Sequence, residues 1–161
     1  MKRSDLLKLL TVTTLAFLYI GVRPAHGGGE DPLVPRVPEE KLASAKLMKN
    51  PVVADAKSIA AGREIYYGKG LCVNCHGESG KGDGPGGASF DPGPRNFTNT
   101  AWQAVRTDGE LFTAITDGTQ YGMIAFGDNL TAKEKWEVIN FIRTFGAGAV
   151  AKNTSAKSEQ K

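Results

Sequence analysis

Apolar residues recur with a helical spacing in the last third of the chain. They occupy positions i, i+3, i+4 and i+7 between Val138 and Phe145, which places them on one face of a helix. Thr131 and Glu134 precede this run with the spacing of a capping box, in which each side chain accepts a hydrogen bond from the other residue's backbone N–H. We therefore predict a helix with a buried face that begins after Thr131 and ends at Gly146.

The same kind of pattern predicts three earlier helices. A second capping box, Thr107 with Glu110, indicates a helix over 107–118. A one-sided apolar pattern predicts a helix over 55–67, and a shorter helix over 39–50 must end before the proline that follows it. No stretch of useful length alternates between apolar and polar residues, so we predict no strand and an all-α domain.

The middle of the chain lacks a pattern of its own. Residues 68–98 are dominated by Gly, Pro, Asp and Asn, and so long an irregular stretch is unusual in a compact domain. Domains of about a hundred residues bury a modest share of their surface and often need a disulfide, a metal or a cofactor. The sequence therefore predicts that some other group orders this middle segment.

The N-terminus has the pattern of an export signal. Lys2 and Arg3 precede an apolar run over 9–22, and small residues follow it. This run is short for a membrane span but suits the core of a signal peptide. We expect residues 1–27 to be a signal peptide, with cleavage before Gly28. The alternative is an uncleaved anchor that associates with a membrane through residues 9–22.

The distribution of charge excludes one class of function. Four basic residues and one acidic residue lie in 1–27, so this segment alone accounts for the net charge of +3 of the whole chain. Residues 50–146 contain nine Lys and Arg against eleven Asp and Glu. Nucleic-acid binding requires Lys and Arg clustered on the folded part of a protein, so we expect no nucleic-acid partner.

These patterns divide the chain into four parts. Residues 1–27 form the signal, and residues 28–51 form an extension that is rich in Pro and Gly and contains the short helix. Residues 52–146 form the helical domain. Residues 147–161 are small and polar, and we expect them to form a disordered tail.

The chemistry of the chain centres on the run from Cys72 to His76, which holds both cysteines. Cys72, Cys75 and His76 form a C-x-x-C-H sequence, the attachment signature of c-type haem. Two thiols at this spacing add to the two vinyl groups of one porphyrin, and the following histidine then becomes the proximal ligand of the iron. Covalent haem attachment takes place on exported chains in bacteria, which agrees with the N-terminal signal.

Other sites built on two cysteines fit less well. A redox dithiol of the thioredoxin type follows a strand, and no strand precedes Cys72. A structural zinc ion needs four ligands, and the only further histidine, His26, lies in the predicted signal. A disulfide between Cys72 and Cys75 would close a very short loop and stabilise little.

Beyond this motif, the chain resembles the class I monohaem cytochromes c over about residues 52–146. The matching segments are GREIYY, CVNCHG, GKGDGPGG, DPGPRNFT, TDGTQYGMIAFGDNLT and WEVINFIRTF. The resemblance implies a small cytochrome c-like helical domain wrapped around one covalently attached haem c. It also implies that the N- and C-terminal helices cross near Gly62, with Tyr66 and Phe141 as the aromatic pair that holds them.

The resemblance further implies a set of residues around the iron. Met123 occupies the position of the second axial ligand, opposite His76. The carbonyl of Pro94 corresponds to the acceptor that orients the proximal imidazole. For the adjacent Arg95 two roles stay open: it reaches a haem propionate, or it faces solvent. Many relatives have proline directly after the ligand methionine, whereas Ile124 follows it here.

An iron held by His76 and Met123 has no open position, and this favours electron transfer over catalysis. We therefore expect no catalytic residues and an exported electron carrier that works between respiratory redox proteins, a donor of the dehydrogenase or reductase type and an acceptor of the oxidase type. The expected location is the periplasm or the outer face of the cytoplasmic membrane. Two alternatives remain open: a haem subunit dedicated to one oxidoreductase or oxidase complex, and a haem enzyme or gas sensor with an open iron.

Overall fold

The structure is a computed structural model that describes residue 31 and residues 34–159. Its described part is helical and contains no strand, so the all-α prediction is confirmed. The predicted signal peptide lies outside the described residues, and within the described ranges no helix is long and apolar enough to cross a membrane. The helices are α1 (Glu39–Leu47), α2 (Ala56–Tyr67), α3 (Val73–His76), the 3₁₀ helix η1 (Pro85–Gly87), α4 (Thr100–Val105), α5 (Asp108–Asp117) and α6 (Ala132–Glu159).

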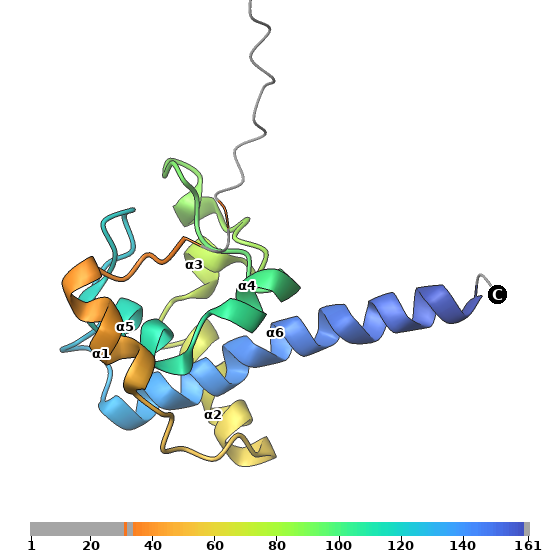
Figure 1. Cartoon of the computed structure of the whole chain (residues 1–161), viewed down its shortest axis with the longest axis horizontal. Helices are drawn as coiled ribbons and strands as arrows, with labels where there is room; N and C mark the ends of the chain where they lie inside the picture. The colour runs from red at the N-terminus through yellow and green to blue at the C-terminus, as the bar shows by residue number, and fades with distance from the viewer. Residues whose placement is uncertain (1–30, 32–33, 160–161) are drawn as a thin grey trace, which may run out of the picture.

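The domain is built on the crossing of α2 and α6 (Figure 1). A Cβ atom added to Gly62 of α2 would lie 2.0 Å from the carbonyl oxygen of Glu137 in α6. Only glycine permits so close an approach of two helix backbones. Next to this contact, the rings of Tyr66 and Phe141 meet edge to face with centroids 5.3 Å apart. The predicted crossing point and aromatic pair are therefore both confirmed.

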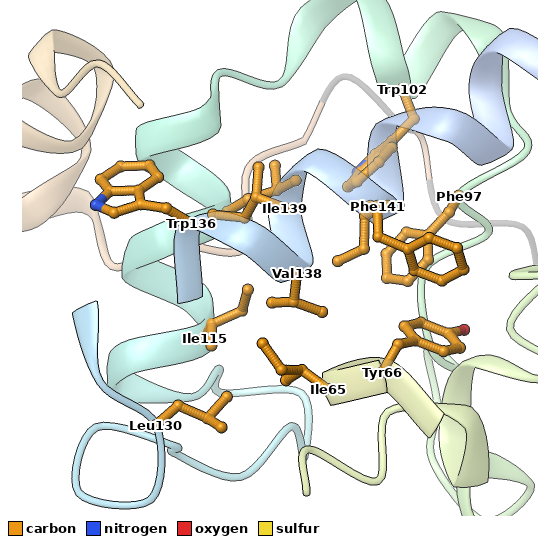
Figure 2. Packing of buried hydrophobic residues seen from close by; sticks show 12 residues of the cluster. Ile65, Tyr66, Phe97, Trp102, Ile115, Leu130, Trp136, Val138, Ile139 and Phe141 are labelled. Atoms are coloured by element: carbon orange, nitrogen blue, oxygen red, sulfur yellow. The ribbon is translucent and has the colours of Figure 1, made fainter. Parts of the chain in front are cut away.

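The apolar face of α6 forms the centre of the hydrophobic core. Val138 and Ile139 are fully buried, and Figure 2 shows Val138 between Ile115 of α5 and Ile65 of α2. Burial of such side chains stabilises the fold by about 1.5–3 kcal/mol each. The buried cluster consists of Ile65, Tyr66, Phe97, Trp102, Leu111, Ile115, Leu130, Trp136, Val138, Ile139, Phe141 and Ile142.

The predicted capping boxes form at the start of both later helices. The backbone N–H of Thr107 donates to the Glu110 carboxylate at 2.8 Å, and the backbone N–H of Glu110 donates back to the Thr107 hydroxyl at 3.2 Å. Thr131 and Glu134 make the same reciprocal pair at the start of α6, at 2.8 and 3.3 Å. Each box satisfies backbone donors that a helix N-terminus otherwise leaves without partners.

The end of α6 differs from the sequence prediction. The predicted stop at Gly146 does not occur, and α6 continues to Glu159 through residues that were expected to lack structure. Gly146 is buried against the side chain of Gln103 inside the helix. No proline follows it, and several of the next residues are alanine, the best helix former. In Figure 1 this part of α6 extends beyond the other helices.

The segment 68–98 has little regular structure, as predicted, and contains only α3 and η1. Backbone hydrogen bonds fold it back on itself: the N–H of Gly82 donates to the His76 carbonyl at 2.9 Å, and the N–H of Phe97 donates to the Gly80 carbonyl at 2.7 Å. Gly82 has a φ of 80°, a conformation that favours glycine. The helix α4, which follows this segment, is an element that the apolar pattern did not predict.

The N-terminal extension lies on the domain through α1. Ala45 of α1 is fully buried, and a Cβ atom added to Gly109 of α5 would lie 2.0 Å from the Ala45 carbonyl oxygen. The two helices therefore pack closely although α1 has only a narrow apolar edge.

Candidate functional site

The residues that the sequence singled out surround one cavity of about 510 Å³. Cys72, Cys75 and His76 reach it from α3 and the residue before it, and Met123 reaches it from the loop between α5 and α6. Pro94 and Arg95 line it as well. Residues separated by about fifty positions in the chain thus converge on a single site. The apolar wall consists of Val37, Leu71, Phe90, Phe97, Trp102, Leu111, Ile115, Phe126 and Ile142.

The two cysteines are free thiols on neighbouring positions of the cavity wall. Burial raises the pKa of the Cys72 thiol to about 12, so this thiol is protonated at neutral pH. The nucleophilic cysteine of a redox dithiol has a lowered pKa, and Cys72 does not fit that role. Among the described residues, no three His, Cys, Asp or Glu side chains are placed to hold a metal ion.

The imidazole of His76 is buried and held in one orientation. Its Nδ1 lies 3.1 Å from the carbonyl oxygen of Arg95, and because a carbonyl only accepts, Nδ1 carries the proton. The ring stacks on Phe97 with centroids 4.2 Å apart. Burial lowers the pKa of His76 to about 4, so the ring is neutral and its Nε2 keeps a lone pair. A neutral imidazole oriented through Nδ1–H is the usual form of a metal-ligating histidine.

The acceptor for this imidazole differs from the one implied by the resemblance. The carbonyl of Arg95 accepts the bond, not that of Pro94. The Pro94 carbonyl instead faces Gly82, where an added Cβ atom would lie 2.4 Å from it. The guanidinium of Arg95 donates to the backbone carbonyl of Val34, so this side chain holds the N-terminal extension. A contact between Arg95 and a propionate stays a prediction.

Met123 lies on a tight loop that places it at the cavity. Gly118 and Gly122 flank it with φ angles of 75° and 93°, values that a side chain would oppose. The N–H of Thr119 donates to the Met123 carbonyl at 2.9 Å, which closes the loop. Its ligand role also stays a prediction.

Sequence reasoning missed four polar side chains on the cavity wall. Arg106 and Glu110 form a buried ion pair at 2.7 Å, and their i, i+4 spacing on the chain was a signal for it. The Thr119 hydroxyl is buried and has no hydrogen-bond partner within the described part of the protein. Arg36 of the extension lines the cavity too, and nothing in the pattern of the Pro-rich segment indicated this position.

The donor set fits a haem c. An apolar cavity with two thiols, a neutral oriented imidazole and a thioether has the groups that would attach and ligate a haem c. A bound haem c supplies an iron that changes between the ferric and ferrous states.

Comparison with known proteins agrees with this geometry. The family model described as cytochrome C oxidase, cbb3-type, subunit III matches residues 57–142, more than half of the chain. The chain belongs to this family of c-type cytochromes. The resemblance to the monohaem cytochromes c is thereby confirmed.

A solved structure shares the fold of this cytochrome. The chain is similar to a chain of the Kuenenia stuttgartiensis reducing HAO-like protein complex, with 26% sequence identity and a TM-score of 0.52. The match covers 61% of this cytochrome and 49% of the other chain, so it spans about half of that neighbour's length. No curated protein matches the chain.

Proposed function

We propose that the protein carries one electron on a single haem c that is bound to Cys72 and Cys75 through thioether bonds. His76 and Met123 are the axial ligands in this proposal. The observation that carries it is the convergence of these four side chains on one apolar cavity. The domain thus supplies each of the contacts that a covalently attached, six-coordinate haem requires.

The surrounding residues would suit the site to electron transfer rather than catalysis. With both axial positions taken by side chains, no position is left for a substrate, and the change of oxidation state requires little rearrangement. A thioether ligand raises the reduction potential relative to a second imidazole. The hydrogen bond from His76 to the Arg95 carbonyl would keep the imidazole in place in both oxidation states.

We propose further that the protein is exported and works in the periplasm or at the outer face of the cytoplasmic membrane. The basic residues and apolar run of 1–27 support this location. Its partners would be redox proteins of a respiratory chain, a donor of the dehydrogenase or reductase type and an acceptor of the oxidase type.

A second candidate function is that of a haem subunit dedicated to one oxidoreductase or oxidase complex. The similarity to a chain from a multi-subunit redox complex supports it. The nearly balanced charge of residues 50–146 also supports it, because a weak field steers many different partners poorly. Native membranes test this candidate: a stable partner that co-purifies in equal amount favours it, and purification of the cytochrome alone refutes it.

The proposed haem ligation is tested by the optical spectrum of the full chain after maturation with haem. We expect a weak far-red sulfur-to-iron band in the ferric state and no uptake of carbon monoxide in the ferrous state. Met123→Ala should abolish the band and permit uptake. Met48→Ala is the matched control, since Met48 packs against the core and does not line the cavity. A high-spin spectrum and ready carbon monoxide uptake in the wild type would instead indicate an enzyme or a gas sensor.

A further inference from the structure

One side chain of the N-terminal extension contacts the loop that orients His76 and the loop that carries Met123. Nη2 of Arg36 donates to the Gly93 carbonyl at 2.8 Å, and its guanidinium carbon lies 5.2 Å from the centroid of the Tyr121 ring. Gly93 stands two residues before Arg95, whose carbonyl orients His76. Tyr121 stands two residues before Met123. Arg36 therefore joins the His76 side of the cavity to the Met123 side.

The segment around Arg36 is held at both of its ends. On one side, the guanidinium of Arg95 donates to the Val34 carbonyl. On the other side, Val37 is buried and lines the cavity, and α1 follows it with its close contact between Ala45 and Gly109. Residues 34–37 are thus held against the domain, with Arg36 and Val37 in the cavity wall.

The charge of Arg36 also acts on the site. Arg36 lines the cavity together with Lys69, Arg95 and the ion pair of Arg106 with Glu110. The guanidinium of Arg36 is held on the loop whose Arg95 carbonyl accepts from His76, so the cation lies near the proposed iron ligand. A fixed positive charge near an iron disfavours the more positive, ferric state.

We propose that Arg36 is a positioning residue of the haem site. It clamps the loops 93–95 and 121–123 together over the haem, and its charge favours the reduced state. This inference rests on the proposed function, because it requires a haem held between His76 and Met123. It assigns to the N-terminal extension a direct role in electron transfer.

The test compares three substitutions in the haem-loaded full chain. Arg36→Gln removes the charge and the contact with the Tyr121 ring, whereas Arg36→Lys keeps the charge and loses the planar group. Arg63→Gln is the matched control, since Arg63 lies over the Tyr67 ring at 4.9 Å, is exposed and does not line the cavity. The two readouts are the ferrous-to-ferric ratio at a fixed solution potential and the affinity of the ferric protein for added imidazole, which competes with Met123.

We expect Arg36→Gln to lower the ferrous-to-ferric ratio at least about threefold, because the nearby positive charge is lost. Its affinity for imidazole should rise about fivefold or more, because the Met123 loop opens more often. Arg36→Lys should raise the imidazole affinity and leave the ratio unchanged, and Arg63→Gln should change neither. An Arg36→Gln protein that matches Arg63→Gln in both readouts overturns the proposal.

Two further outcomes are decided in the same experiment. If Arg36→Gln does not accumulate, Tyr121→Leu removes the ring beside Arg36 without a change of charge. Raised imidazole affinity in Tyr121→Leu supports the clamp, and wild-type affinity overturns it. If the wild-type chain takes up no haem or holds an open iron, the proposed function fails, and this inference fails with it. The wild-type spectrum shows that failure before any variant is compared.

Discussion

The helix crossing and the cavity loops of this cytochrome are stabilised in different ways. At the crossing of α2 and α6, backbones touch at Gly62 and the neighbouring side chains of Val138 and Ile139 are fully buried. The loops over 68–98 and 118–130 contain almost no regular structure and enclose an apolar cavity of about 510 Å³. Glycine turns and single backbone hydrogen bonds shape them.

This difference indicates which half of the domain can form without its cofactor. Close-packed side chains stabilise the crossing by themselves. The loops gain few such contacts, because the side chains that line an unfilled cavity lack partners on one side. We infer that the crossing forms first and that the loops take their final shape around the haem. Four predictions test this contrast.

The largest effect is expected from Cys72→Ser combined with Cys75→Ser. This chain should lose all covalently bound haem, and amide protection in 68–98 and 118–130 should fall to that of freely exchanging segments. Protection in α2 and the first half of α6 should persist. Hydrogen exchange followed by mass spectrometry measures both regions in one sample. Equal protection in loops and helices would contradict the proposed division.

Gly62→Ala tests the crossing itself. The added methyl group would lie 2.0 Å from the Glu137 carbonyl, so the helices must move apart, and we expect a loss of about 3 kcal/mol in the free energy of unfolding. Gly148→Ala is the control in α6, because a Cβ atom there meets nothing within 4 Å. It should leave stability unchanged or raise it slightly. Similar results for both variants in denaturant unfolding would refute close contact at Gly62.

Tyr66→Phe tests the link between the two regions. The Tyr66 hydroxyl donates to the Gly77 carbonyl at 2.8 Å inside the protein and so ties α2 to the turn after the haem motif. Loss of this hydrogen bond should lower the free energy of unfolding by about 1–2 kcal/mol, because a buried carbonyl loses its donor. The control is Tyr67→Phe, whose hydroxyl makes an exposed bond to the Glu78 carbonyl at 2.8 Å. Thermal unfolding of the two variants should rank Tyr66→Phe as the less stable.

The smallest effect concerns the pH dependence of the cap of α6. Hydrogen bonds from Lys69 and Thr131 lower the pKa of Glu134 to about 2. Since this pKa is below that of the unfolded chain, the stabilisation is present above about pH 4.5 and is lost as the pH falls toward 2. Glu134→Gln should therefore lower the free energy of unfolding by less than about 1 kcal/mol at neutral pH, and by less still near pH 2. Urea unfolding at several pH values measures this loss, with the substitution of the exposed Glu64 by Gln as the control. A loss of stability in Glu134→Gln that is as large in acid as at neutral pH would contradict the prediction.

The site was only partly predictable from sequence. The C-x-x-C-H motif places three groups within five residues, so local spacing alone indicates their joint role. Arg36 and the Arg95 carbonyl could not be predicted in this way. A backbone carbonyl has no signature in a sequence, and Arg36 reaches the cavity from a Pro-rich segment far from the motif. Such partners depend on how distant loops meet.

By itself, the sequence determined the helical class, the capped starts of α5 and α6 and the haem motif, whereas the crossing at Gly62 was implied only by the resemblance to the monohaem cytochromes c. The helical class and the caps depend on apolar periodicity and on side chains three residues apart, and the haem motif spans five residues, so all three are local properties. Only the tertiary structure decided that α6 continues past Gly146, that Arg95 rather than Pro94 accepts from His76, and that the N-terminal extension lines the cavity. Each of these features depends on contacts between segments that are distant in the chain, or on the absence of a residue that would end the helix. Neither cause produces a repeating pattern in the sequence.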